Sequence, residues 1–420
     1  MFLRRFLPCL LIACFSTPAG AYSVLSHEAI VDALWDVRVK PLLLARYPNA
    51  TPAQLKQAHG YAYGGAIIQD LGYYPHGSQQ FSDLTHYVRT GDFILALIKE
   101  SHDLNDLAFA LGSLSHYVGD LDGHRFATNI GEPILYPKLR KKFGPVVTYE
   151  DDPISHLKTE FGFDVLEVAR GNFAPQAYHD FIGFYVAKDL VARAFSDTYG
   201  LSLADLFGNF DLAIASYRSA VSRTIPMATR IAWAQKRSEI KHSEPGISRH
   251  RFIYIMKRAS YEKEWGTRLD EPSRMEKFLA FILYLIPPIG PLRALQLKVP
   301  TPPVEKLFMD SFTRATDQYH EKLDSVVAHN LILADENYDV GTITIAGQYA
   351  MADQSQAFWL HKLAEKKFAT LTPTLRSELH TYFGDLSAPM KLKQNSEAWK
   401  QLQTDYAALQ SAPSGQTATK

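Results

Sequence analysis

Apolar residues recur every three to four positions through much of the chain, which is the period of an amphipathic helix. The strongest pattern runs from Ser101 to Asp120, and His116 continues its apolar face. That face consists of Leu104, Leu107, Ala108, Leu111 and Leu114. No convincing alternation of apolar and polar residues indicates a strand. The pattern therefore predicts an all-α protein of many helices.

Two further helices are predicted before this one. Ser26 is a plausible N-cap for a helix that reaches Trp35, with His27 in its first turn. Thr51 and Pro52 are typical of the start of another, which extends to about Asp70. The second contains Gly60, Gly64 and Gly65, which are costly inside a helix and so indicate close helix packing.

The rest of the chain also favours helices. Residues 174–238 contain amphipathic patterns, among them Asp211 to Arg223 and a helix around Trp233, and residues 304–410 resume the same periodicity. Residues 277–297 are very apolar but interrupted by prolines, and a bilayer span needs about 20 apolar residues. A buried helix is favoured there over an interfacial membrane anchor. Pro300, Pro302 and Pro303 predict a stiff connector, and residues 411–420 a disordered tail.

The amino terminus resembles an export signal. Two arginines precede an apolar run from Phe6 to Phe15, and Ala19-Gly20-Ala21 has the small residues of a cleavage site. Cleavage after Ala21 would make Tyr22 the first residue of a secreted or periplasmic protein. The alternative is a lipoprotein attached through Cys14. Both cysteines, Cys9 and Cys14, lie in this leader, so the mature chain would hold metals through other residue types.

Length and charge limit the function classes. A chain of 420 residues accommodates one main domain and an extension. Its 44 basic and 44 acidic residues balance, so no overall field attracts nucleic acid or an anionic membrane. The cluster from Lys138 to Lys142 would suit a basic groove that binds nucleic acid, but it is equally well a solvated helix end. His320, His329, His361 and His380 are scattered, and we interpret them as surface or packing residues.

Candidate metal ligands occur as pairs of histidine and acid. His116 and Asp120 lie four residues apart, as do His156 and Glu160, so each pair shares one helix face. Imidazole and carboxylate groups are ligands that zinc accepts. A histidine and an aspartate near a buried helix face need partners, which favours metal binding over chance.

The ordered set of candidate ligands resembles the zinc-dependent phospholipase C family, which is grouped with single-strand-specific zinc nucleases in one all-α superfamily. The resemblance runs from Tyr22 to about Val168. It implies a zinc-dependent phospholipase C-like domain over residues 22–240, followed by a helical region of unknown role over 241–410. The set is Tyr22, His27, Asp70, His86, His116, Asp120, His124, His156 and Glu160.

The resemblance implies up to three zinc ions. Asp70, His86, His116 and Asp120 would bind the first ion, and His124, His156 and Glu160 the second. His27, a bridging Asp120, and the amine and carbonyl of Tyr22 would bind the third. His124 follows Asp120 more closely than in the best-known members, so Asp122 is an alternative ligand. Asp70 is also the candidate proton acceptor in catalysis.

Three functions follow as hypotheses. The favoured one is an exported phospholipase C that hydrolyses phospholipid headgroup phosphodiesters, with possible peripheral membrane contact and with no nucleic-acid partner expected. A single-strand-specific nuclease and a non-catalytic helical zinc protein are the alternatives. Headgroup preference and oligomeric state stay open. Tyrosines near the ligands would wall a headgroup site or simply pack: Tyr73, Tyr74, Tyr87 and Tyr117.

Overall fold

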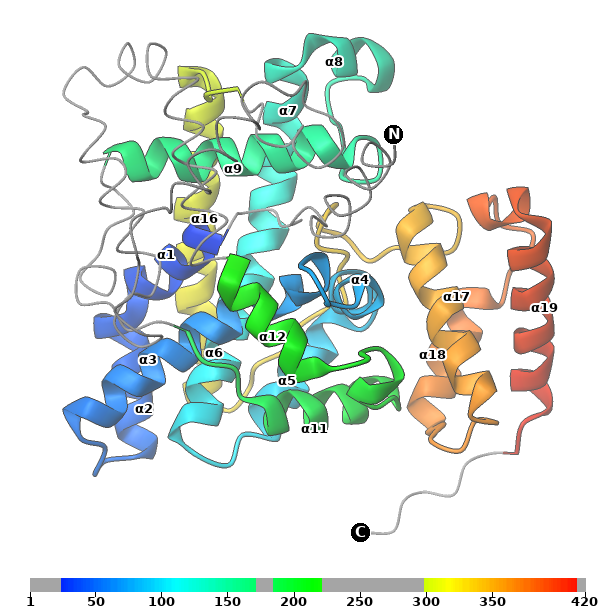
Figure 1. The fold of residues 1–420 in the computed structure, drawn as a ribbon, viewed down its shortest axis with the longest axis horizontal. Helices are drawn as coiled ribbons and strands as arrows, with labels where there is room; N and C mark the ends of the chain where they lie inside the picture. Colours follow the sequence, from blue (N-terminus) through cyan, green and yellow to red (C-terminus); the bar gives the residue numbers. More distant parts are fainter. Residues whose placement is uncertain (1–23, 171–183, 221–297, 414–420) are drawn as a thin grey trace, which may run out of the picture.

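The computed structural model describes residues 24–170, 184–220 and 298–413 (Figure 1). Within these ranges the chain is all α, as predicted, and extended pairing is limited to one isolated bridge between Asn337 and Thr342. The leader with Tyr22, the helix around Trp233, residues 277–297 and the tail from 414 lie outside the described residues.

The helices of the first range are joined by short turns and single-turn segments. They are α1 (Val24–Leu34), η1 (Trp35–Val39), α2 (Lys40–Arg46), α3 (Pro52–Ile67), η2 (Ile68–Tyr73), α4 (Gln79–Tyr87), α5 (Thr90–Lys99), α6 (Leu104–Gly123), η3 (His124–Thr128), α7 (Asn129–Leu135), α8 (Pro137–Phe143) and α9 (Pro153–Arg170). The later elements are α11 (Lys188–Tyr199), η4 (Leu203–Asp205), α12 (Phe210–Ser219), α16 (Pro302–Val327), α17 (Ala350–Glu365), α18 (Pro373–Phe383), η7 (Lys391–Gln394) and α19 (Ser396–Ser411).

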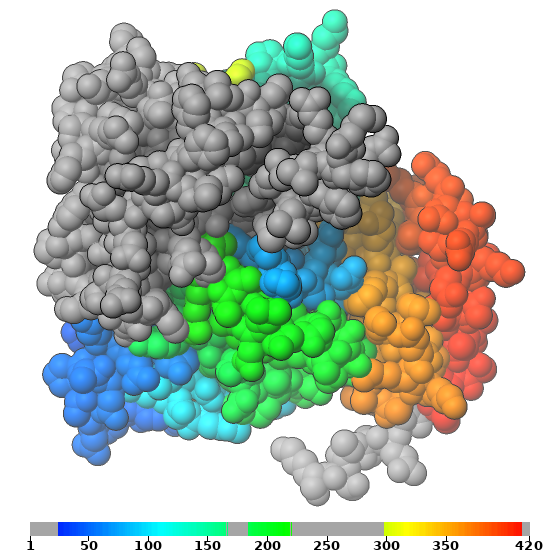
Figure 2. Space-filling model, viewed as in Figure 1, coloured from blue at the N-terminus to red at the C-terminus, as the bar shows by residue number. Residues whose placement is uncertain are grey.

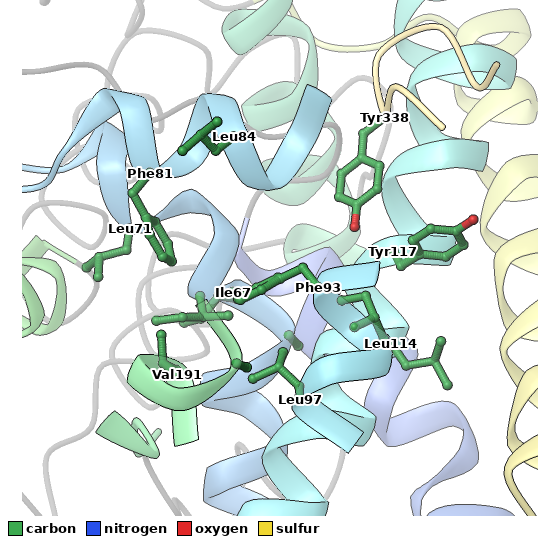
Figure 3. Close-up of a cluster of buried hydrophobic side chains, with 14 of the residues drawn as sticks. Ile67, Leu71, Phe81, Leu84, Phe93, Leu97, Leu114, Tyr117, Val191 and Tyr338 are labelled. Atoms are coloured by element: carbon green, nitrogen blue, oxygen red, sulfur yellow. The ribbon is translucent and has the colours of Figure 1, made fainter. Parts of the chain in front are cut away.

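Helix α6 is the centre of the fold. Asp103 caps it by accepting hydrogen bonds from the backbone N–H groups of Asn105 and Asp106. Every residue from Leu107 to Gly123 is buried, because α1, α3, α5 and α16 all pack around this helix. Figure 3 shows part of the resulting core, where Leu114 and Tyr117 of α6 lie near Phe93 and Leu97 of α5. A helix buried on all sides places its polar side chains inside the protein.

Close packing is confirmed at two of the predicted glycines: Gly64 lies against the backbone of Tyr185, and Gly65 lies where α3 meets α6. A Cβ atom at Gly65 would lie 1.9 Å from the carbonyl oxygen of Phe109, and one at Gly112 would lie 1.9 Å from that of Ala62. Only a residue without a side chain allows these backbones to approach so closely. The contact fixes α6 against the end of α3, immediately before Asp70.

Two predicted local structures are wrong. Ser26 is not an N-cap, because α1 already includes Val24. Instead Asp164 of α9 accepts hydrogen bonds from the N–H groups of Leu25 and Ser26 and from the Ser26 hydroxyl. A carboxylate from a distant helix therefore replaces the local cap. The proline connector is also wrong in part, because Pro302 and Pro303 begin α16, where a missing N–H costs nothing.

The C-terminal helices pack directly on the first part of the chain. Tyr319 of α16 donates a hydrogen bond to the carbonyl of Leu111, and Trp359 of α17 donates one to the carbonyl of Tyr199. Both rings are fully buried in the same apolar core as α6. Helices α17, α18 and α19 form one side of the molecule, orange to red in Figures 1 and 2. Among the described residues, no helix is long and apolar enough to cross a membrane.

Candidate metal centre

Eight of the predicted ligands come together from six elements of the fold. His27 lies on α1, Asp70 on η2 and His86 on α4. The remaining five are His116 and Asp120 on α6, His124 on η3, and His156 and Glu160 on α9. All eight are buried. Tyr22 lies outside the described residues.

These side chains form three groups in which the potential ligand atoms all lie within 4.8 Å of one another. We call Asp70, His86 and His116 the first ligand group, and His124, His156 and Glu160 the second ligand group. The third ligand group is His27, His116 and Asp120. His116 belongs to two groups, so the first and third are contiguous.

Asp120 is the point where the groups meet. Its Oδ1 atom lies 3.2 Å from His27 Nε2, and its Oδ2 atom lies 3.1 Å from His116 Nε2 and 3.3 Å from His86 Nε2. The same Oδ2 atom is 3.9 Å from His124 Nε2 of the second ligand group. Two atoms that share a tetrahedral zinc at about 2.0–2.1 Å lie about 3.3–3.4 Å apart. The spacing around Asp120 therefore fits a carboxylate that bridges zinc ions.

The polar atoms of these groups also fit a metal chemically. The Nε2 atoms of His86, His116 and His124 are buried and make no hydrogen bond. The same is true of both Asp120 carboxylate oxygens and of Glu160 Oε1. Burying polar atoms without partners costs several kcal/mol. A set of imidazole nitrogens and carboxylate oxygens directed at each other suits zinc, which accepts both.

The other ring nitrogen of four imidazoles faces a partner outside the ligand groups, and in three of the four the two atoms are within hydrogen-bond distance. His86 Nδ1 lies 2.7 Å from the carbonyl oxygen of Ser82, and His116 Nδ1 lies 2.9 Å from that of Ala66. In the second ligand group the partners are carboxylates. His124 Nδ1 lies 2.8 Å from Asp339 Oδ1, and His156 Nδ1 lies 3.5 Å from Glu132 Oε2. Such partners fix the ring and the tautomer, which leaves Nε2 free to bind a metal.

The electrostatics of the first and third ligand groups are those of close ion pairs. Burial lowers the pKa of His86, but the carboxylates of Asp120 and Asp70 outweigh it and raise the pKa to about 10. Burial raises the pKa of Asp120, yet the surrounding imidazoles, above all His116, hold it well below its ordinary value. These groups stabilise both signs of charge within one buried space.

In the second ligand group, the pKa shifts of the histidine and the acid are opposite to those of His86 and Asp120. Burial, and then the neighbouring His124, lower the pKa of His156 to about 3. Burial, and then the negative charges of Asp120 and Asp70, raise the pKa of Glu160 well above its ordinary value. Burial also raises the pKa of Asp339, but His124 outweighs it and lowers the pKa to about 2. Burial therefore favours the neutral forms of His156 and Glu160, while Asp339 stays negative.

Asp122 does not join the second ligand group. It is buried, and its Oδ1 atom accepts a hydrogen bond from Gln318 of α16 at 3.2 Å. Of the four tyrosines predicted near the ligands, Tyr73 lies against a candidate ligand, and the other three have the partners given below. Tyr73 lies edge-on to His86 with ring centres 5.8 Å apart, whereas Tyr74 packs on Tyr217 and Tyr117 donates a hydrogen bond to the carbonyl of Ala334. Tyr87, also buried, packs against Tyr349.

Sequence reasoning missed two residues of this centre. Asp339 is 215 positions from the histidine that it contacts, in a region where no ligand cluster was expected. Glu132 is fully buried on α7 with no hydrogen bond to either carboxylate oxygen. Neither residue belongs to a histidine and acid pair at helical spacing. No local signal in the sequence identifies Asp339, because only the fold brings it to His124.

An all-α domain with buried helices that bring clustered imidazoles and carboxylates together is a candidate multinuclear metal protein. Residues 26–209 match the family model described as zinc dependent phospholipase C, in agreement with the resemblance of the ligand set. Comparison with curated proteins and with solved structures gives no match. This match supports a zinc-dependent phosphodiesterase function of the phospholipase C type. All eight described ligand candidates lie inside the matched segment, and Asp339 lies outside it.

Proposed function

We propose that the protein is an exported zinc phosphodiesterase that hydrolyses the headgroup phosphodiester of phospholipids. The observation that carries the proposal is the three contiguous ligand groups around Asp120, inside the family-matched segment. Export belongs to the same proposal, because cleavage after Ala21 would free the Tyr22 amine. Asp164 supports this by holding the N–H groups of Leu25 and Ser26, three and four residues beyond Tyr22.

Residues of this chain divide the chemical work. When bound, zinc supplies Lewis-acid polarisation of the phosphodiester and a water acidic enough to attack near neutral pH. Asp120 keeps the ligand groups in one cluster, because its two oxygens face imidazoles from three helices. Asp70 lies beside His86 at 3.4 Å and is almost fully buried. We propose it as the group that accepts the proton of the attacking water.

The surface around α8 supports a lipid substrate. Helix α8 exposes Lys138, Arg140, Lys141 and Lys142. Three exposed apolar side chains flank it in sequence: Ile134, Val146 and Ile154. Cations beside exposed aliphatic groups suit the interface of an anionic membrane.

The described surface lacks a feature that a nuclease would use. Proteins that bind single-stranded nucleic acid stack bases on exposed aromatic rings. Each aromatic side chain in the ranges 24–170, 184–220 and 298–413 whose exposure is described is buried or half-buried. The aliphatic and basic surface of α8 therefore favours a lipid over a nucleic acid.

The test combines composition and activity on one preparation. The protein is purified from the exported fraction, its amino terminus is sequenced, and its zinc content is measured by elemental analysis. Hydrolysis is then followed with phosphatidylcholine vesicles, with the same vesicles containing anionic lipid, and with a single-stranded oligonucleotide. We expect Tyr22 as the first residue, about three zinc ions per chain, and release of phosphorylated headgroup.

The other outcomes contradict the proposal in different ways. Cleavage of the oligonucleotide without lipid hydrolysis would identify a nuclease. Bound zinc with neither activity would identify a structural zinc protein. A chain that begins at a lipidated Cys14 would remove the Tyr22 amine and with it the proposed third site.

A further inference from the structure

A three-residue segment beyond the family-matched region, Asn337 to Asp339, contacts residues of both the first and the second ligand groups. The N–H group of Tyr338 donates a hydrogen bond to the carbonyl of His86 at 3.0 Å. The Tyr338 ring lies against the imidazoles of His86 and His116, with ring centres 5.3 and 5.9 Å away. The next residue, Asp339, contacts His124 of the second ligand group. Adjacent residues of the C-terminal region therefore reach both halves of the centre.

The Asp339 carboxylate contacts three hydrogen-bonding groups. Its Oδ2 atom accepts hydrogen bonds from the Tyr149 N–H group at 2.9 Å and from the Tyr349 hydroxyl at 2.6 Å. Its Oδ1 atom faces His124 Nδ1 at 2.8 Å. Asp339 is 1% exposed, so water does not compete for these bonds. A carboxylate fixed in this way has one orientation to offer to the imidazole.

The backbone of the segment is equally constrained. Asn337 accepts the N–H group of Asp339 on its side-chain oxygen at 2.9 Å, and the Asp339 carbonyl accepts a hydrogen bond from the Asn129 side chain at 2.7 Å. Asn129 follows His124 by five residues, just beyond η3. The segment therefore contacts both His124 and Asn129, the residue that follows the short helix η3 on which His124 lies.

We propose that Asn337 to Asp339 is a built-in part of the metal centre, with Asp339 as the positioning residue of His124. A carboxylate only accepts hydrogen bonds, so His124 must donate its Nδ1 proton to Asp339 and keep Nε2 unprotonated. Nε2 then faces His156 and Glu160, where the second ligand group would hold zinc. Occupancy of that group depends on a region of the chain that the family match does not include.

Zinc retention tests this inference. It rests on the metal centre of the proposed function, but not on its substrate. Wild-type protein and the Asp339→Asn variant are dialysed against graded chelator, and the zinc that remains per chain is measured. Loss of a partner to a ligating histidine lowers metal affinity about 10–100-fold. We expect Asp339→Asn to release one zinc ion at about 10–100-fold less chelator, while the others are retained as in the wild type.

The chain offers a matched control two residues before this segment. Asp335 is half-buried and accepts the N–H group of Asp92 at 3.0 Å, but it touches no candidate ligand. Asp335→Asn should retain zinc as the wild type does. A variant of His124 tests coupling: once His124→Ala has removed the imidazole, adding Asp339→Asn should cause no further loss from the second ligand group.

Each outcome is decisive. Equal zinc retention in the wild type and Asp339→Asn would overturn the inference, as would equal losses in Asp335→Asn and Asp339→Asn. A wild type without zinc would instead overturn the proposed function. If Asp339→Asn does not fold, Tyr349→Phe takes its place. It removes one hydrogen bond to Oδ2, and a smaller loss of the same zinc ion is expected.

Discussion

The first and second ligand groups hold their imidazoles in different ways. In the first, backbone carbonyls of α3 and α4 orient His116 and His86, and nearby aspartates provide negative charge. In the second, the partners of His124 and His156 are the carboxylates of Asp339 and Glu132. The first group therefore depends on helix packing within the family-matched segment, and the second on charged side chains from other elements.

The electrostatic contrast follows from this difference. His86 is surrounded by carboxylates and has a raised pKa, whereas His156 is buried beside another imidazole and has a lowered one. A backbone carbonyl is supplied by any residue, but a carboxylate requires a particular side chain. We therefore expect the first group to respond to packing mutations and the second to single substitutions of acidic residues.

The largest effect on zinc content and activity should come from Asp120→Ala, because the Asp120 carboxylate faces imidazoles of both the first and the second ligand groups. We expect loss of zinc and a fall in phosphodiesterase activity of more than about 100-fold. Mutation of a residue that only hydrogen-bonds to a metal ligand already lowers metal affinity or activity about 10–100-fold. Asp122→Ala is the matched control, because Asp122 is buried on the same helix but contacts Gln318. Zinc analysis and lipid hydrolysis check both, and similar losses in the two variants would contradict the bridging role.

Gly112→Ala should damage the first group through packing alone. Its Cβ would lie 1.9 Å from the Ala62 carbonyl, on the helix pair that sets His116 against Ala66. Overpacking costs about 1–3 kcal/mol, so the unfolding free energy should fall by that amount or more. Zinc should be lost first from the group that contains His116. Gly208→Ala, with no atom within 4 Å of the added Cβ, should change neither quantity.

Glu132→Gln should act on the second group alone. The 3.5 Å separation from His156 Nδ1 is long for a hydrogen bond, so we expect a loss of zinc affinity near the lower end of the range, about 10-fold. Chelator competition measures it, with Glu150→Gln as a control on a nearby loop, where that carboxylate contacts Ala350. Loss from the first group instead would remove the distinction between the two halves.

The smallest effect on zinc should come from a contact of the C-terminal region that involves no metal ligand. Burial outweighs Arg89 and raises the pKa of Glu378 from its ordinary value of 4.5 to about 7. Between these values the folded state keeps a proton that the unfolded chain has released. This group's contribution to the unfolding free energy therefore falls as pH rises from about 4.5 to 7.

Glu378→Gln should flatten that dependence, by about 1–2 kcal/mol after allowance for solvent screening. Urea unfolding at pH 5 and pH 7.5 measures the change. Zinc retention should stay that of the wild type. A loss of zinc in this variant would show that general docking of the C-terminal region, rather than Asp339, controls the second group.

The sequence by itself predicted the all-α class, which the structure confirms, and a set of candidate ligands, eight of which the structure brings together. His116 and Asp120, and His156 and Glu160, are recognisable because a helix brings residues four apart onto one face, so local spacing predicts proximity. The glycines of α3 likewise predicted a close helix contact, since few other reasons justify their cost inside a helix. These inferences depend on interactions within one helix or on its immediate surface.

Only the tertiary structure decided which groups support the ligands. Asp164 replaces the local cap expected at Ser26, and Asp339 orients His124 from 215 positions away. Such contacts follow from the packing of whole helices, and no periodicity in the sequence records them. Burial and the neighbouring charges then set the electrostatics, because the same residue type carries opposite pKa shifts at His86 and His156. The ligand types are fixed by local sequence, whereas their orientation and charge depend on which distant residues the fold places beside them.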